Sequence, residues 1–247
     1  MVFEKLERIV EIQVEYEAKS SLAIQAGREE RLRAVEQPVI RVGGQPVLPG
    51  SSLKGVLRSL LESLFSQNGI LVCVPEAAIP LERKKQRNGI QEYVKEIGRK
   101  VPCKTEDLCP VCEIFGSAGV SARATFLDAR PTTEPKLLER RHVAITRDTR
   151  AAAGGALLEV ETVDAGTKFD GTIRVINPER WHIGALITAV ENLTSLGLGS
   201  KKSEGYGEVA TTIVSVTPKA MKEGKWVPEE VSIDEYKEAF MKYLREQ

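Results

Sequence analysis

The sequence predicts a protein of the α+β class, and three observations carry this prediction. Residues 10–16, VEIQVEY, alternate apolar and polar side chains, which is typical of a half-buried β-strand. Residues 53–65 repeat apolar side chains at the i, i+3, i+4 and i+7 spacing of one buried helix face. Segments of both kinds recur along the chain, so helices and strands are interleaved and do not fall into separate halves.

Stripped of insertions and of the C-terminal helix, the predicted elements follow one another in the order strand, helix, strand, strand, helix, strand. The predicted strands are residues 10–16, 123–129, 157–166, 167–176 and 208–216, and the predicted helices are 51–65, 183–193 and 233–247. The runs 157–166 and 167–176 meet near Ala165 and Gly166, a pattern that predicts a β-hairpin. The overall order is that of the ferredoxin-like fold, which also underlies the RNA-recognition motif with its RNA-binding open sheet face.

Composition bounds the class of protein. The 247 residues are 42% hydrophobic and 28% charged, and 35 basic residues balance 35 acidic ones, which argues against indiscriminate polyanion binding but allows a local basic groove. No apolar run approaches the roughly 20 residues that span a bilayer, so we expect a cytoplasmic protein without a membrane partner. Two histidines are too few for a three-histidine zinc site, and no P-loop or dinucleotide-binding motif is present.

Residues 48–65, LPGSSLKGVLRSLLESLF, begin with a turn and continue as an amphipathic helix. Ser51 or Ser52 is the expected N-cap, because a hydroxyl accepts from the free N–H groups of the first turn. Lys54 and Arg58 follow within two turns. One interpretation is a well-capped core helix; the other is a helix start that faces a phosphate.

The stretch LGLGSKKSEGYG, residues 196–207, is rich in glycine and lysine. Gly197 and Gly199 allow close backbone approach, Lys201 and Lys202 supply positive charge, and Tyr206 offers a ring on which a base can stack. The alternative interpretation is a flexible connection from helix to strand with a solvated lysine pair. Together with the start of the helix at 51, the loop favours RNA binding.

Four segments together resemble one known family. They are PVIRVGGQPVLPGSSLKGVLRSLLE (38–62), CPVCEIFGSA (109–118), RRHVAITRDTRAAAGGALLEVETVDAGTKF (140–169) and LGLGSKKSEGYGEV (196–209). The chain resembles the RAMP superfamily of CRISPR effector proteins and is most similar to the backbone subunit of type III interference complexes.

The resemblance implies a single domain over residues 1–247, with an insertion at about 67–122 and a thumb hairpin at about 136–172. It implies guide CRISPR RNA and complementary target RNA as partners, together with other effector subunits and further copies of the chain. The helix start and the glycine-rich loop would lie against the guide. The segment HVAITRDTRAA, with His142 and Arg147, would wedge between guide and target.

The resemblance also implies a catalytic position. Active backbone subunits cut target RNA with an aspartate just before a PVIR-like motif, and here Glu36 stands at that place. A longer side chain shifts a Mg²⁺ or Mn²⁺ ion or a general base by about 1 Å, to which catalysis is sensitive. Endoribonuclease activity is therefore one hypothesis, and a solvated loop acid in a non-cleaving subunit is the other.

All four cysteines lie in the predicted insertion. Cys103, Cys109 and Cys112 form a C-x₅-C-x₂-C array, and Cys73 is available upstream as a fourth ligand. Four thiolates make a closed structural Zn²⁺ site, and related family members carry zinc here, whereas unligated thiols in a reducing cell are the alternative. A zinc-stabilised RNA-recognition protein of another ribonucleoprotein, without nuclease activity, is the alternative to the CRISPR function.

Overall fold

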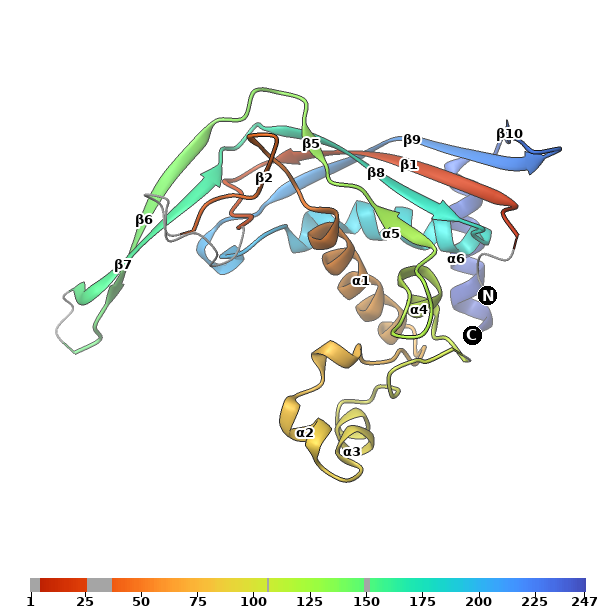
Figure 1. Cartoon of the computed structure of the whole chain (residues 1–247), viewed down its shortest axis with the longest axis horizontal. Coiled ribbons are helices and arrows are strands. Elements are labelled where there is room, and N and C mark those ends of the chain that lie inside the picture. The colour runs from red at the N-terminus through yellow and green to blue at the C-terminus, as the bar shows by residue number, and fades with distance from the viewer. Residues whose placement is uncertain (1–4, 26–36, 106, 149–151) are drawn as a thin grey trace.

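The computed structural model describes residues 5–25, 37–105, 107–148 and 152–247, and it confirms the α+β class (Figure 1). Its main antiparallel sheet has the strand order β10-β9-β1-β8-β4, with β5 also paired to β8. The strands of this sheet are β1 (Arg8–Ala18), β4 (Ala124–Phe126), β5 (Arg130–Pro131), β8 (Lys168–Ile176), β9 (Val209–Lys222) and β10 (Lys225–Pro228). A two-stranded ribbon of β2 (Arg41–Val42) and β3 (Gln45–Pro46) precedes the first helix.

Strand β1 lies at the centre of the sheet and shows the predicted alternation. Its buried residues all face the helices and pack against buried residues of β8: they are Val10, Ile12, Val14, Tyr16 and Ala18. Ile12 lies opposite Ile173 of β8 and Val216 of β9. A one-residue bulge leaves Val214 between the paired Ile213 and Ser215 of β9, with a side chain that is 58% exposed.

Helices cover one face of the sheet (Figure 1). They are α1 (Gly50–Gln67), α5 (Arg180–Leu196) and α6 (Ile233–Glu246). Edge-on contacts join the Phe65 ring to the rings of Trp181, Phe240 and Tyr243 and so tie the three helices together. At Gly184 the backbone of α6 comes so close to α5 that a Cβ would overlap the carbonyl oxygen of Tyr236. Ser232 and Glu235 form the capping box that starts α6.

A long hairpin projects from one end of the sheet (Figure 1). It consists of β6 (Leu137–Ile145) and β7 (Ala152–Val163), paired from Leu137–Val163 outward. The predicted pairing of residues 157–166 with 167–176 is therefore wrong. The turn at 164–167 instead passes the chain from the hairpin into β8, whose Phe169, Ile173 and Val175 are buried in the main core. Alternation identifies both strands but not their partners.

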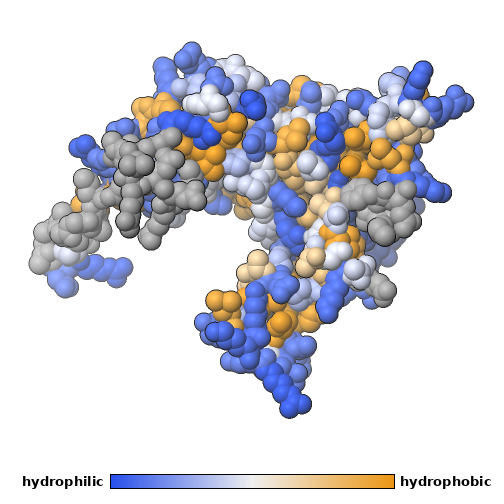
Figure 2. Space-filling view, viewed as in Figure 1, coloured by the Kyte–Doolittle hydropathy of each residue, from blue (hydrophilic) through white to orange (hydrophobic). Residues whose placement is uncertain are grey.

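A small lobe projects beyond the C-terminal end of α1, away from the main sheet (Figures 1 and 2). It contains two short α-helices, α2 (Leu81–Lys85) and α3 (Gly89–Glu96), and a 3₁₀ turn at Glu76–Ala78. Val74, Ile79 and Val94 form a core of its own. The following α4 (Pro110–Phe115) returns to the main core. The space-filling view shows the molecule hollowed between the lobe and the hairpin (Figure 2).

Candidate functional site

The start of α1 is capped differently from the sequence prediction. Pro49 occupies the N-cap position, and neither Ser51 nor Ser52 caps the helix, so that prediction is wrong. Instead the Gly50 N–H donates to Asp128 Oδ1 at 2.8 Å. Position 50 needs glycine, because a Cβ there would overlap the carbonyl oxygen of Phe126. A carboxylate already occupies the place where an anion would meet the first free amide, so the helix start alone is no phosphate cradle.

Lys54 and Arg58 lie one turn apart on α1 but have different surroundings. Arg58 donates to Glu62 Oε1 at 2.9 Å, to the carbonyl oxygen of Gly116 at 3.1 Å and to Cys112 Sγ at 3.5 Å. Its guanidinium is therefore occupied within the protein. Lys54 is half-buried and has no ion pair among the described residues. Burial, followed by repulsion from Arg58, lowers the pKa of its amine. Lys54 remains free to meet an anion.

The glycine-rich loop is held by contacts within the chain. Gly197 and Gly199 have positive φ, and a Cβ at either would overlap a carbonyl oxygen, that of Gly207 or of Ala23 respectively. Lys201 is largely buried and pairs with Glu204 at 3.2 Å. Lys202 is exposed and has no ion pair within the described part of the chain. The two glycines do allow a close backbone approach, as predicted, but the groups that approach them are carbonyl oxygens of the protein's own backbone.

A groove joins the start of α1 to the glycine-rich loop, and we call it the α1–loop groove. It has a volume of about 460 Å³. Aliphatic side chains of Leu48, Leu53, Val56, Leu198, Ala23 and Ile24 form its walls, and Gln25, Ser52, Gly199, Ser200 and Lys202 complete the lining. The structure thus brings two segments together that are about 150 residues apart in the sequence.

Tyr206 is not available for stacking on a base in this structure. Its side chain is buried, and its hydroxyl lies 3.0 Å from His142 Nε2 of the hairpin. His142 Nδ1 is 3.0 Å from Glu204, and the Arg140 guanidinium lies over the Tyr206 ring at 5.5 Å. These residues join the base of the hairpin to the glycine-rich loop, and we call them the hairpin latch. Arg147 lies apart from them, exposed in the turn of the hairpin.

The open face of the sheet carries paired charges. Glu11 pairs with Arg174 at 2.8 Å and with Lys219 at 3.3 Å, and Glu15 pairs with Lys168 at 2.8 Å. The neighbours Gln13 and Ser215 bond to each other across the strands. An RNA-recognition motif uses aromatic rings on this face. Here the face offers mutually neutralised side chains instead.

Glu36, the predicted catalytic carboxylate, lies outside the described residues. The next residue, Gln37, bonds to the base of the hairpin: its N–H donates to the Glu159 carbonyl and its carbonyl accepts from the Glu161 N–H. The Glu161 carboxylate, which is buried, accepts from the Val39 N–H and pairs with Arg41. The PVIR segment is thus fastened to β7 by its arginine.

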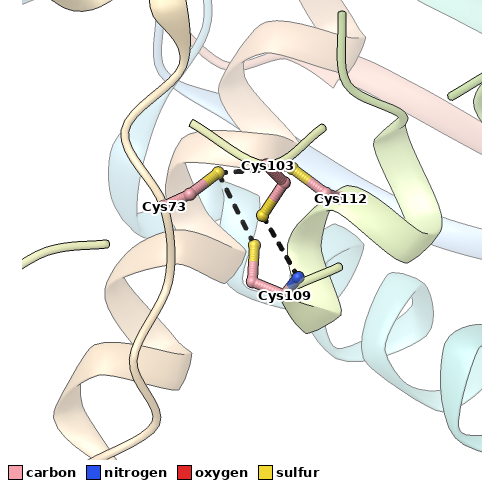
Figure 3. A group of neighbouring side chains, drawn as sticks. All are labelled: Cys73, Cys103, Cys109 and Cys112. Atoms are coloured by element: carbon pink, nitrogen blue, oxygen red, sulfur yellow. Dashed lines mark hydrogen bonds between the residues drawn. The ribbon is translucent and has the colours of Figure 1, made fainter. Parts of the chain in front are cut away.

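The four cysteines converge on one point (Figure 3). Their Sγ atoms all lie within 4.8 Å of one another, and all four residues are buried. Cys73 Sγ is 3.3 Å from Cys112 Sγ and 3.7 Å from Cys109 Sγ. A tetrahedral zinc with bonds of about 2.3 Å separates its sulfur ligands by about 3.8 Å. The donor set therefore fits a structural zinc ion, and Cys73 takes the fourth place despite its distance in the sequence.

Interactions around the cluster suit bound thiolates. Hydrogen bonds from Cys112 and Cys73 lower the pKa of the Cys109 thiol, whereas their hydrogen bonds with Cys109 raise the pKa of the Cys73 and Cys112 thiols. The Cys109 N–H donates to Cys103 Sγ at 3.3 Å. Arg58 adds a positive charge beside Cys112. One residue beyond Cys112, Glu113 lies 3.3 Å from Nε2 of the fully buried His182 on α5. Charge and hydrogen bonding of this kind orient ligands and stabilise their deprotonated form.

Three acidic residues of these sites were missed by sequence reasoning. Asp128 caps α1 from the segment between β4 and β5, Glu161 anchors the PVIR segment, and Glu204 is shared by Lys201 and His142. Asp128 and Glu161 act on partners far away in the chain, so no local spacing marks them. Glu204 alone had a signal, because it follows Lys201 by three residues within the loop.

A family model of the RAMP superfamily matches residues 15–210 of the chain. This range includes the end of β1, α1, the cysteine cluster, the hairpin and the glycine-rich loop. No curated protein matches the chain. In the part of the chain that the structure describes, no helix combines the length and the apolar character needed to cross a membrane.

Proposed function

The chain belongs to the RAMP superfamily, and on that premise we propose that it is a guide-binding backbone subunit of a type III CRISPR effector complex. RAMP proteins are generally CRISPR-associated RNA-binding proteins that act with CRISPR RNA and effector subunits. The α1–loop groove is the observation that carries the proposal. The free cation Lys202 lines this groove, next to a hairpin that projects from the sheet, and the free cation Lys54 lines a separate pocket on the cysteine side of the same helix.

The proposal includes a ferredoxin-like core. Strands β1, β4, β8 and β9 come first, second, third and fourth among the core strands, with α1 after the first and α5 after the third. In the sheet they lie in the order fourth, first, third, second, and every neighbouring pair is antiparallel. This arrangement supports the split βαβ topology. The cysteine cluster would hold a structural zinc that supplies no catalysis, because four thiolates leave no position for water.

The RNA that accompanies the protein tests this function. The chain is purified from its native cells, and the bound RNA is extracted and sequenced. We expect short RNAs that carry CRISPR repeat sequence, together with other effector subunits. Bound RNAs without repeat sequence would contradict the CRISPR assignment and favour a zinc-stabilised RNA-recognition protein of another ribonucleoprotein.

Cleavage of target RNA is a second candidate function, and the anchoring of Gln37 favours it. Gln37, the described residue that follows Glu36 in the sequence, bonds to Glu159 and Glu161 of β7 in the hairpin that would separate guide from target. The assembled complex is incubated with labelled complementary RNA and Mg²⁺ or Mn²⁺. We expect weak or absent cutting by the natural protein and regularly spaced cuts by Glu36→Asp, which restores the shorter acid. If neither protein cuts, the assignment of the catalytic position to Glu36 is wrong.

A further inference from the structure

The walls of the α1–loop groove do not match a phosphate alone. Leu48, Leu53 and Leu198 are buried beneath it, and Ile24 and Val56 add further aliphatic surface. A phosphate gains nothing from such walls, since charged groups lose hydration against apolar surface. Among the described residues, the single exposed cation in the lining is Lys202. The occupant therefore needs an apolar part as well as a negative charge.

The groove also lacks the features of a base-stacking site. The described residues of its lining include no aromatic ring, and the one tyrosine of the glycine-rich loop, Tyr206, is buried in the hairpin latch. Sequence-independent binding of bases uses aromatic platforms. The groove therefore offers no ring on which a base can stack, whereas the C–H groups of a sugar pack well against its aliphatic side chains.

Two hydroxyl groups complete the lining. Ser200 Oγ donates to the Ala23 carbonyl at 3.1 Å, which orients the oxygen and leaves its lone pairs free to accept. Ser52 is exposed in the first turn of α1, and its side chain makes no hydrogen bond among the described residues. The groove therefore combines an aliphatic wall, one oriented acceptor, one free hydroxyl and a lysine at its edge.

We propose that the α1–loop groove binds a ribose of the RNA backbone and that Ser52 and Ser200 recognise its 2′-hydroxyl, while Lys202 contacts the adjacent phosphate. The inference rests on the proposed function and adds the sugar as the feature that is recognised. The 2′-hydroxyl donates and accepts hydrogen bonds and is the group by which a protein distinguishes RNA from DNA. Ser52 and Ser200 are then the residues that determine RNA specificity.

Removal of both hydroxyls tests the proposal cleanly. In Ser200→Ala the Ala23 carbonyl keeps the bond from the backbone N–H of residue 200 at 2.9 Å, so no buried acceptor is left unpaired. Ser52→Ala removes an exposed side chain. Ser203→Ala is the matched control, because Ser203 is an exposed serine of the same loop that does not line the groove. Thermal unfolding of each variant checks that it is folded.

Binding is measured with a short single-stranded RNA and with DNA of the same base sequence that contains uracil in place of thymine. We expect the unchanged protein to prefer RNA and the Ser52→Ala/Ser200→Ala variant to lose about tenfold of that preference, as expected for two hydrogen bonds. Its affinity for DNA and the salt dependence of its binding stay unchanged. Ser203→Ala keeps the full preference for RNA.

Three results would overturn the inference. The first is a full RNA preference in the double variant. The second is an equal loss of affinity for RNA and DNA, which would mean that the two serines only maintain the shape of the groove. The third is an unchanged protein that binds RNA and DNA equally well. That result leaves the proposed function intact, because guide binding does not require discrimination against DNA. Failure to bind RNA at all would instead contradict both the inference and the proposed function.

Discussion

The two sides of α1 differ in how completely their polar groups are paired. On the lobe side, four thiols converge, and Arg58 donates to Glu62, Gly116 and Cys112. On the loop side, Lys202 and the Ser52 hydroxyl have no partner among the described residues. A closed, fully paired cluster contributes to stability, whereas free polar groups around a groove await a ligand. On our proposal, the cysteine cluster has a structural role and the α1–loop groove binds the ligand.

The largest effect is expected at the cysteine cluster. Protein never exposed to chelator should contain close to one zinc per chain by elemental analysis. Cys109→Ser should lose the metal and lower Tm by about 10 °C or more, because loss of a structural metal removes several kcal/mol of folding free energy. Zinc added back after chelation should restore the unchanged protein but not the variant. Less than about a tenth of a zinc per chain would refute the site, since structural zinc binds tightly.

Alanine substitutions one turn apart on α1 sharpen the comparison. Arg58→Ala removes three internal contacts and should lower the free energy of unfolding by about 2 kcal/mol. Lys54→Ala breaks no ion pair among the described residues and should change it by less than about 0.5 kcal/mol. Chemical denaturation measures both variants. An equal loss of stability from the two would erase the distinction between a structural and a binding cation.

The smallest effect is expected at the hairpin latch. Tyr206→Phe removes the hydrogen bond to His142 and should cost about 1 kcal/mol locally. Amide hydrogen exchange should speed up in the hairpin and the glycine-rich loop, while α3 stays protected. Tyr93→Phe is the matched control, because Tyr93 lies in the lobe and makes no side-chain hydrogen bond within the described residues. Unchanged hairpin protection in Tyr206→Phe would mean that the latch does not hold the hairpin.

Periodicity predicted the elements that pack into the core. The strand at 10–16 and the helices at 51–65, 183–193 and 233–247 are present, because each buries one regular face. Strand partners could not be predicted in the same way, since residues 157–166 and 167–176 alternate alike yet belong to the hairpin and the sheet. The short β10 was missed, because it is exposed throughout and has no apolar alternation.

At the candidate sites too, contacts between distant segments could not be predicted from local sequence patterns. The C-x₅-C-x₂-C array marked Cys103, Cys109 and Cys112, and Cys73 was the expected fourth ligand although no spacing fixed it. The structure brings Cys73 beside the other three. The residue types of the glycine-rich loop drew attention to Lys201, Lys202 and Tyr206, but only tertiary contacts distinguish the paired Lys201 and the buried Tyr206 from the free Lys202. Capping by Asp128 instead of a serine is a tertiary contact of the same kind.

Salt dependence of RNA binding tests the proposed binding along α1 and the glycine-rich loop most directly. The logarithm of the binding constant for single-stranded RNA is measured against the logarithm of salt concentration for the unchanged protein and for Lys54→Ala/Lys202→Ala. The control is Lys168→Ala/Lys219→Ala, which removes the same charge from the paired face of the sheet. We predict that the slope of the first variant falls by about 1.4, or about 0.7 for each lost phosphate contact, while the control keeps its slope. An unchanged slope in Lys54→Ala/Lys202→Ala, or a larger loss in the control, would contradict binding along α1 and the glycine-rich loop.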